Sequence, residues 1–143
     1  KHITWVVGTG AVLPVADDSV DICTSLFSPL PKAEMLRVLK PNGHLLVATP
    51  APMHLHAMRE KLFDTVNPHN PAKFIGELAP EFDLVNEWQI DADLCLDNQS
   101  LNDLMDMTPY TYKAKLDRKT ALKAQDKFDV TASFCVYLFK RAI

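Results

Sequence analysis

Two short apolar segments, separated by one helix length of sequence, constrain the fold of this chain more than any other feature. Residues 21–29 and 40–50 each read as a buried strand that ends in proline and small polar residues. Residues 31–40 between them carry apolar side chains at helical spacing, and proline suits the first turn of a helix. A strand, a helix and a second strand in this order are the building block of an open parallel sheet.

The carboxyl ends of these two strands predict where a ligand binds. In open parallel sheets, ligands lie just beyond the carboxyl ends of the strands. We therefore expect the active-site edge at residues 27–29 and 49–52. Gly8 and Gly10 follow an expected strand at residues 3–7, but no helix comes after them, so they do not form a phosphate-binding loop.

The second half of the chain predicts a long strand, a helical insert and a final strand. Residues 53–66 show a helical apolar face, and residues 82–96 alternate between apolar and polar side chains, as in a strand with one wet face. A helix capped by Asn98 or Ser100 should reach Met107. A break at 108–112, a helix at 117–127 and a strand at 130–138 complete the order. No crossover helix of the β-α-β kind joins the last two strands, which predicts an α/β fold whose parallel strands end in an antiparallel pair.

Composition favours one globular domain over residues 1–143. The apolar content is 48%, and no apolar run approaches the ~20 residues of a membrane span. Cys23, Cys95 and Cys135 are far apart and odd in number. We expect core thiols in a reducing cytoplasm, and neither a disulfide framework nor a zinc knuckle.

The charge distribution is uneven along the chain. The formal net charge of -3 argues against a generally basic nucleic-acid binder. Nine acids and no Lys or Arg lie between Glu77 and Asp106, whereas six Lys or Arg and two Asp lie between Lys113 and Lys127. Such asymmetry can orient a protein on a polyanion, although two ordinary solvated faces explain it equally well.

Four motifs resemble a known group of enzymes. Residues 13–21 (Leu-Pro-Val-Ala-Asp-Asp-Ser-Val-Asp) and 37–45 (Arg-Val-Leu-Lys-Pro-Asn-Gly-His-Leu) resemble the second half of class I S-adenosylmethionine-dependent methyltransferases. Residues 48–55 (Ala-Thr-Pro-Ala-Pro-Met-His-Leu) and 107–110 (Met-Thr-Pro-Tyr) are finer matches. With their spacing, they resemble the bacterial large-subunit (23S) rRNA (guanine-N1) methyltransferases over nearly the whole chain. Asn42 and Phe27 depart from that pattern, which usually has Gly and Tyr there.

The resemblance implies a partial Rossmann-like sheet, S-adenosylmethionine as cofactor and large-subunit rRNA as partner. In that family a zinc module, the first strands, the glycine-rich loop and the ribose-binding acid come before the segments matched here. We therefore expect the C-terminal part of a methyltransferase domain, inactive by itself, with zinc only in the missing N-terminal module. The absent strands would leave an apolar sheet edge, through which we expect self-association. The parent enzyme is expected in the cytoplasm, without a membrane partner.

The resemblance and the sheet-edge argument together select candidate site residues. A loop along the cofactor's adenine is implied for Gly10, Ala11 and Leu13. Phe27, Ser28 and Pro29 end the central strand, where the methyl group and the target base should meet. His54 is the candidate base or guanine contact, because guanine N1 carries a proton that must leave. Stacking on the base is expected from Tyr110 and Tyr112. Contacts to RNA phosphates are expected from Lys113, Lys115 and Lys119.

Two other functions stay open. A small-molecule methyltransferase of quinone or biotin biosynthesis shares the broader signatures, and a non-catalytic module would only mediate contacts between proteins. Cys-x-x-Cys pairs upstream of Lys1 in the parent gene would favour the rRNA enzyme over the small-molecule enzyme. Cofactor binding by the parent chain would exclude the non-catalytic module.

Overall fold

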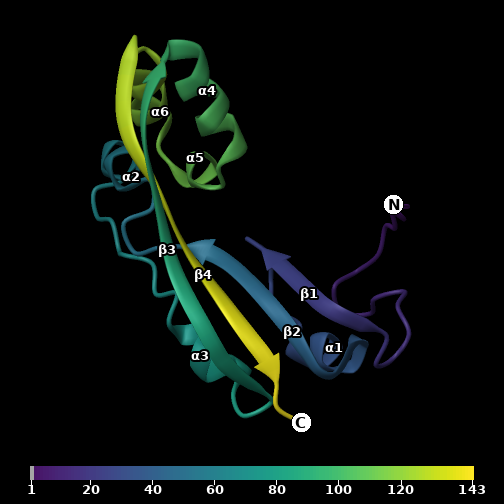
Figure 1. Ribbon diagram of the computed structural model, residues 1–143. Helices are drawn as coiled ribbons and strands as arrows, with labels where there is room; N and C mark the ends of the chain where they lie inside the picture. The colour runs from purple at the N-terminus through teal and green to yellow at the C-terminus, as the bar shows by residue number, and fades with distance from the viewer. Residues whose placement is uncertain (1) are drawn as a thin grey trace. The chain divides into compact units, whose positions relative to one another are not determined.

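The computed structural model describes residues 2–143, which divide into two compact units. Unit 1 comprises residues 2–49, Pro71–Trp88 and Cys135–Ile143, and unit 2 comprises Pro50–Asn70 and Gln89–Phe134. One four-stranded sheet has the order β1-β2-β4-β3, and β3 and β4 contribute residues to both units (Figure 1). The strands are β1 (Val20–Leu26), β2 (Leu39–Pro50), β3 (Phe82–Asp97) and β4 (Lys127–Arg141).

The strand directions confirm the predicted mixed sheet. β1 and β2 are parallel, with Cys23 opposite Leu45 and Leu26 opposite Ala48. Helix α1 (Lys32–Val38) connects them, as the apolar spacing predicted. β4 lies between β2 and β3 and runs opposite to β3 (Figure 1). The α/β fold with an antiparallel pair beside parallel strands is therefore confirmed.

Strand β2 begins earlier than the sequence predicted. Within the expected segment 40–50, the buried strand itself was expected at residues 45–48, but β2 starts at Leu39, directly after α1. Its pairing with β1 shifts between Val20 opposite Leu39 and Ile22 opposite His44, so the Pro-Asn-Gly segment forms an irregularity inside the strand. A Cβ on Gly43 would lie 2.9 Å from the Lys40 carbonyl oxygen. Glycine is required there by the close approach of the backbone.

The core of unit 1 lies between the sheet and its two helices. Besides α1, this unit contains α3 (Lys73–Leu78), a helix that was not predicted from the sequence. Six residues between proline-rich flanks give too short a pattern to detect. Leu78 is buried in the cluster that contains Met35, Leu39, Leu45, Val47, Leu78, Phe82, Tyr137 and Phe139.

The expected strand at residues 3–7 is wrong. These residues form no strand, and Trp5 is 88% exposed. An apolar run becomes a strand only where another strand offers backbone partners, and β1, at the end of the sheet order, has none on its outer side within residues 2–143. An isolated bridge between Thr9 and Val12 follows the run.

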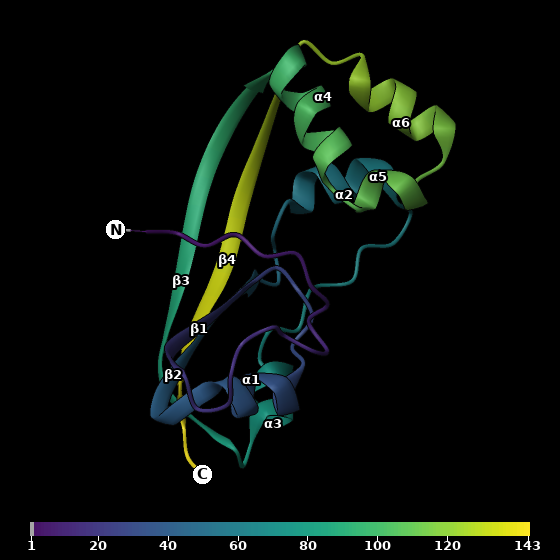
Figure 2. The ribbon, with the colours of Figure 1, turned by 90° about the vertical axis from the view of Figure 1, so that its right-hand side faces the viewer.

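Unit 2 is a small helical cluster on its parts of β3 and β4. It contains α2 (His56–Leu62), α4 (Asn98–Met107), α5 (Tyr110–Lys113) and α6 (Leu116–Lys123), which Figure 2 shows grouped together. Asp97, rather than Asn98 or Ser100, caps α4, since its carboxylate accepts from the Ser100 N–H. α2 is shorter than the predicted helix at 53–66. The core residues are Leu55, Met58, Leu62, Leu101, Met105, Ala114, Leu122, Phe128 and Val130.

The long strand β3 is confirmed in extent but not in burial. The alternation predicted one wet face, yet Phe82 is the only buried residue of β3, and Trp88 and Ile90 are 45% and 52% exposed. The apolar face of β3 is therefore covered only in part within the described residues. Cys95 is likewise exposed, so the expectation of a core thiol is wrong there; Cys23 and Cys135 are partly buried. Within residues 2–143, no helix is long and apolar enough to cross a membrane.

Candidate functional site

The predicted site residues divide between the two units. Unit 1 holds the candidates for the cofactor and the reacting groups, which are Gly10, Ala11, Leu13, Phe27, Ser28 and Pro29. Unit 2 holds the candidates for the target base and the RNA, which are His54, Tyr110, Tyr112, Lys113, Lys115 and Lys119.

Arg37 of α1 fixes the loop of unit 1 that carries Leu13. Its guanidinium donates to the Leu13 carbonyl at 3.1 Å and to both carboxylate oxygens of Glu34, at 2.6 and 2.9 Å. Glu34 in turn accepts from the Leu13 N–H at 2.6 Å. The hydrogen bond from Arg37 lowers the pKa of Glu34 to about 2, with the bond from Leu13 adding to it. Both backbone polar groups of Leu13 are therefore used inside the unit.

Gly10 and Ala11 form the exposed turn before this loop. The Ala11 N–H donates to the Thr9 hydroxyl at 3.3 Å. A Cβ on Gly10 would meet only Pro31, at 3.7 Å, which is an ordinary contact. The turn thus presents small side chains to solvent over a fixed backbone, a surface on which a flat ring can rest.

Strand β1 ends in a sharp turn, at the residues where the sequence predicted the active-site edge. Phe27 has a φ of 54°, which is rare for a residue with a side chain, and its ring is exposed. Its N–H donates to the Ala48 carbonyl at 2.9 Å. The hydroxyls of Ser25 and Ser28 lie 2.9 Å apart. The chain thus turns sharply at Phe27 and is pinned on both sides of the turn, as strained residues at functional sites often are.

His54 in unit 2 is held by β4. The Ala51 N–H donates to the Ser133 carbonyl at 2.9 Å, and the Leu55 N–H donates to the Thr131 carbonyl at 3.0 Å. The Ser133 N–H donates to Nδ1 of His54 at 3.1 Å. The imidazole also packs against the Phe134 ring at a centroid distance of 4.8 Å. His54 is therefore a half-buried, oriented side chain and not a mobile surface residue.

Arg59, which was not among the residues predicted from the sequence, lies at the centre of this cluster. It is only 6% exposed, donates to the His54 carbonyl at 3.4 Å and to the Asn67 carbonyl, and lies 5.4 Å over the Tyr110 ring. No carboxylate of residues 2–143 is within ion-pair distance of it. The signal in the sequence was its position, four residues after Leu55 on the apolar face of α2.

Tyr110 joins the cluster through His69. The Tyr110 hydroxyl and Nε2 of His69 lie 2.8 Å apart. Burial raises the pKa of Tyr110, and burial together with the charge of Arg59 lowers the pKa of His69. Burial, with a smaller effect from His69, also lowers the pKa of His54. Near pH 7 the two histidines and the phenol are consequently neutral around one buried cation.

The remaining RNA-binding candidates lie outside this cluster. Tyr112 is 82% exposed, and Lys113 and Lys115 are also exposed. Asp64 takes part of the positive charge, since it pairs with Arg118 and lies 3.7 Å from Nζ of Lys115. Lys113 and Lys119 make no ion pair with any other residue of the described chain. These side chains are therefore available to a polyanion.

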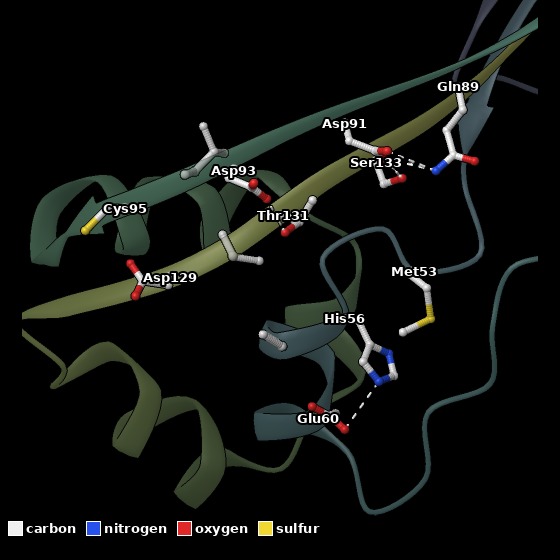
Figure 3. Close-up of a pocket in the computed structure, with 13 residues that line it drawn as sticks. Met53, His56, Glu60, Gln89, Asp91, Asp93, Cys95, Asp129, Thr131 and Ser133 are labelled. Carbon is white, nitrogen blue, oxygen red and sulfur yellow. Dashed lines mark hydrogen bonds and ion pairs between the residues drawn. The ribbon is translucent and has the colours of Figure 1, made fainter.

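A separate cavity of about 660 Å³ lies in unit 2 between α2, β3 and β4 (Figure 3). Ser133 and Thr131 bond to Asp91 and Asp93, and Nε2 of His56 lies 3.3 Å from Glu60. None of the sequence-predicted site residues lines it. Its lining contains four carboxylates and neither Lys nor Arg, so the cavity repels phosphate. The lining residues are Met53, His56, Ala57, Glu60, Gln89, Asp91, Asp93, Leu94, Cys95, Asp129, Val130, Thr131 and Ser133.

Solved structures of similar shape define the class of fold. A candidate methyltransferase from Bacillus halodurans C-125 matches 96% of this chain and 77% of its own at 15% identity, with a TM-score of 0.60. The SpnF cyclase matches 96% of this chain and 55% of its own, also at 15% identity, with a TM-score of 0.56. The fold is therefore that of the Rossmann-like methyltransferases. Because a cyclase shares it, the fold alone does not define the reaction.

Curated relatives are more specific. The 23S rRNA (guanine(748)-N(1))-methyltransferase of Streptomyces fradiae is 31% identical over 101 residues, which are 70% of this chain and 36% of that protein. YxjB of Bacillus subtilis, named as a candidate 23S rRNA (guanine-N1) methyltransferase, is 30% identical over 92% of this chain and 47% of its own length. The chain thus spans less than half the length of these relatives. No protein-family model matches it. The resemblance that the motifs indicated is confirmed.

Proposed function

We propose that this chain is part of an enzyme that transfers a methyl group from S-adenosylmethionine to N1 of a guanine in 23S rRNA. The observation that carries the proposal is the similarity to the Streptomyces fradiae guanine-N1 methyltransferase. The division of the chain supports it as well. Unit 1 offers an exposed turn and a pinned strand end, and unit 2 offers an oriented histidine, a tyrosine and two lysines without ion pairs, Lys113 and Lys119.

The residues of unit 1 fit the cofactor in part. Gly10 and Ala11 would lie along the adenine, and Phe27, Ser28 and Pro29 would border the methyl group. Leu13 would contribute only its side chain, since Glu34 and Arg37 occupy its N–H and carbonyl. When bound, S-adenosylmethionine would supply an electrophilic methyl group on its sulfur to guanine N1, which must give up its proton.

The residues of unit 2 would hold the guanine. Tyr110 would stack on the base, since its ring is fixed by Arg59 and its hydroxyl by His69. Lys113, Lys115 and Lys119 would contact phosphates near the base, and Tyr112 would add a second exposed aromatic face. Arg59 is a positioning residue in this scheme, because it acts through Tyr110 and the segment that carries His54.

A methylation assay with the full-length protein tests the proposal. 23S rRNA and labelled S-adenosylmethionine should give N1-methylguanine, detected by nucleoside mass spectrometry. Tyr110→Ala should weaken RNA binding by roughly 1–3 kcal/mol, the scale of base–aromatic stacking, and Tyr110→Phe should be mild. Methylation of a small molecule instead of rRNA, or no binding of S-adenosylmethionine by the full-length protein, would reject the rRNA assignment.

We also propose that the outer edge of β1 takes part in self-association. β1 ends the sheet order, and Ile22 and Leu26 are 62% and 58% exposed. An apolar edge of this kind recruits another strand. Sedimentation of the 143-residue chain should reveal concentration-dependent dimers, and Ile22→Lys should remove them.

A further inference from the structure

One hydrogen bond fixes the tautomer of His54. The Ser133 backbone N–H donates to Nδ1 of His54 at 3.1 Å. A backbone N–H cannot accept, so Nδ1 must offer its lone pair. The proton of the neutral imidazole therefore sits on Nε2. Within residues 2–143, no residue forms a hydrogen bond with Nε2 of His54.

The surroundings hold this arrangement in place. Ser133 is 3% exposed, and its carbonyl binds the Ala51 N–H while its hydroxyl donates to Asp91. Rotating the ring to free Nδ1 would leave the Ser133 N–H unpaired in a buried place, which is unfavourable. The Phe134 ring at 4.8 Å limits the ring on one face. His54 thus has one free polar atom, and that atom is a donor.

A group in this state cannot remove the guanine proton. A base must offer a lone pair within hydrogen-bond reach, and Nε2 already carries a hydrogen. We propose that His54 is instead a hydrogen-bond donor, through Nε2–H, to the O6 oxygen of the target guanine. This assignment rests on the proposed function, and of the two roles that the sequence left open for His54 it selects the guanine contact over the base.

The donor has a defined task in the chemistry. When guanine loses its N1 proton to water, the N1–H bond breaks and its electron pair stays on the ring, shared between N1 and O6. A hydrogen bond to O6 stabilises the charge that develops there, as preorganised donors do in oxyanion sites. Water takes the proton, so no basic side chain is needed. The neutral state of His54 suits this role, because a protonated imidazole would place a hydrogen on Nδ1 against the Ser133 N–H.

Two substitutions separate the donor from the base. Gln places an amide N–H close to the position of Nε2, whereas Asn replaces only the Nδ1 side of the ring. In single-turnover methylation by the full-length protein, we expect His54→Asn to lose about 100-fold, the lower end for removing one oxyanion donor. His54→Gln should stay within about tenfold of the unmodified protein. His56→Gln, two residues further on in the separate cavity, is the control and should leave the rate unchanged.

Nitrogen NMR of the imidazole ring checks the tautomer without any activity. In the chain labelled with ¹⁵N, the ring nitrogens of His54 should show the Nε2–H tautomer at pH 7.5. An Nδ1–H or charged ring, or equal losses for His54→Gln and His54→Asn in folded variants, would overturn the assignment. If the unmodified full-length protein fails to methylate guanine N1, the proposed function fails and the contact to O6 with it, whereas the tautomer measurement stands by itself.

Discussion

The two units hold their candidate residues in opposite ways. In unit 1, the loop that carries Leu13 depends on Arg37 and Glu34, an ion pair near the surface that also reaches Asp17. In unit 2, Arg59 is buried without a carboxylate, and its neighbours His54, His69 and Tyr110 are neutral. Under the proposed function, the difference suits two tasks. A cofactor can be held by a fixed backbone that stays open to solvent, whereas reading one base requires side chains in a set orientation.

The largest effect should come from the buried cation of unit 2. Arg59→Met keeps the length of the side chain but leaves the His54 and Asn67 carbonyls without their donor. We expect the free energy of unfolding to fall by roughly 2–4 kcal/mol, because two part-buried acceptors lose the donor that the buried Arg59 side chain supplies. Urea unfolding followed by circular dichroism measures the loss. Lys61→Met, at an exposed position of the same helix, should change stability little; equal effects would show that Arg59 is not the hub of the cluster.

A backbone contact provides the matching test in unit 1. Gly43→Ala would place a Cβ 2.9 Å from the Lys40 carbonyl and 3.0 Å from the Leu39 side chain. We expect a loss of about 1–3 kcal/mol, since both neighbours belong to packed backbone or core. Gly76→Ala in α3 is the control, because its Cβ meets nothing within 4 Å. There alanine should stabilise by roughly 0.5–1 kcal/mol, and a stabilising Gly43→Ala would contradict the close approach.

Acid should affect the two units at different pH. The pKa values of His54 and His69 are lowered by burial, so the unfolded chain binds protons first, and unit 2 loses stability as pH falls below about 6.5. The pKa of Glu34 is lowered to about 2 from 4.5, so its contribution to unit 1 is complete above 4.5 and is lost as pH falls toward 2. Residue-resolved hydrogen exchange from pH 7 to 3 should show unit 2 loosening first. Glu34→Gln should remove the acid sensitivity of the loop that carries Leu13 and leave that of unit 2 unchanged.

The smallest effect on stability is expected at the lysines that follow Tyr110. Replacing Lys113, Lys115 and Lys119 by Gln should leave the unfolding midpoint within experimental error, because these side chains lie at the surface. RNA affinity should instead become less dependent on salt, with the logarithmic slope reduced by about 0.7–0.9 for each lost phosphate contact. Filter binding at salt concentrations from about 50 to about 300 mM measures this slope. An unchanged slope would exclude phosphate contacts by these residues.

Local sequence patterns determined the elements whose information lies within a few residues. The strand-helix-strand unit and the extent of β3 followed from apolar spacing and proline, and a helix near α4 was expected although its capping residue, Asp97, was not the one predicted. Two short-range predictions still failed, since residues 3–7 found no partner strand and α3 was too short to detect. A strand is stabilised by its neighbour, and a short helix by the core that it covers, so neither is written in its own segment.

The sequence by itself also selected His54 and Tyr110, because they stand in motifs shared with a methyltransferase family. Only the tertiary structure decided what these residues can do. Ser133 and His54 are 79 positions apart, yet their hydrogen bond sets the proton on Nε2. Arg59 and Tyr110 meet from two helices, and His69 joins them from a loop. Ionisation, tautomer and orientation depend on neighbours that folding brings together, so no reading of adjacent residues could have assigned them.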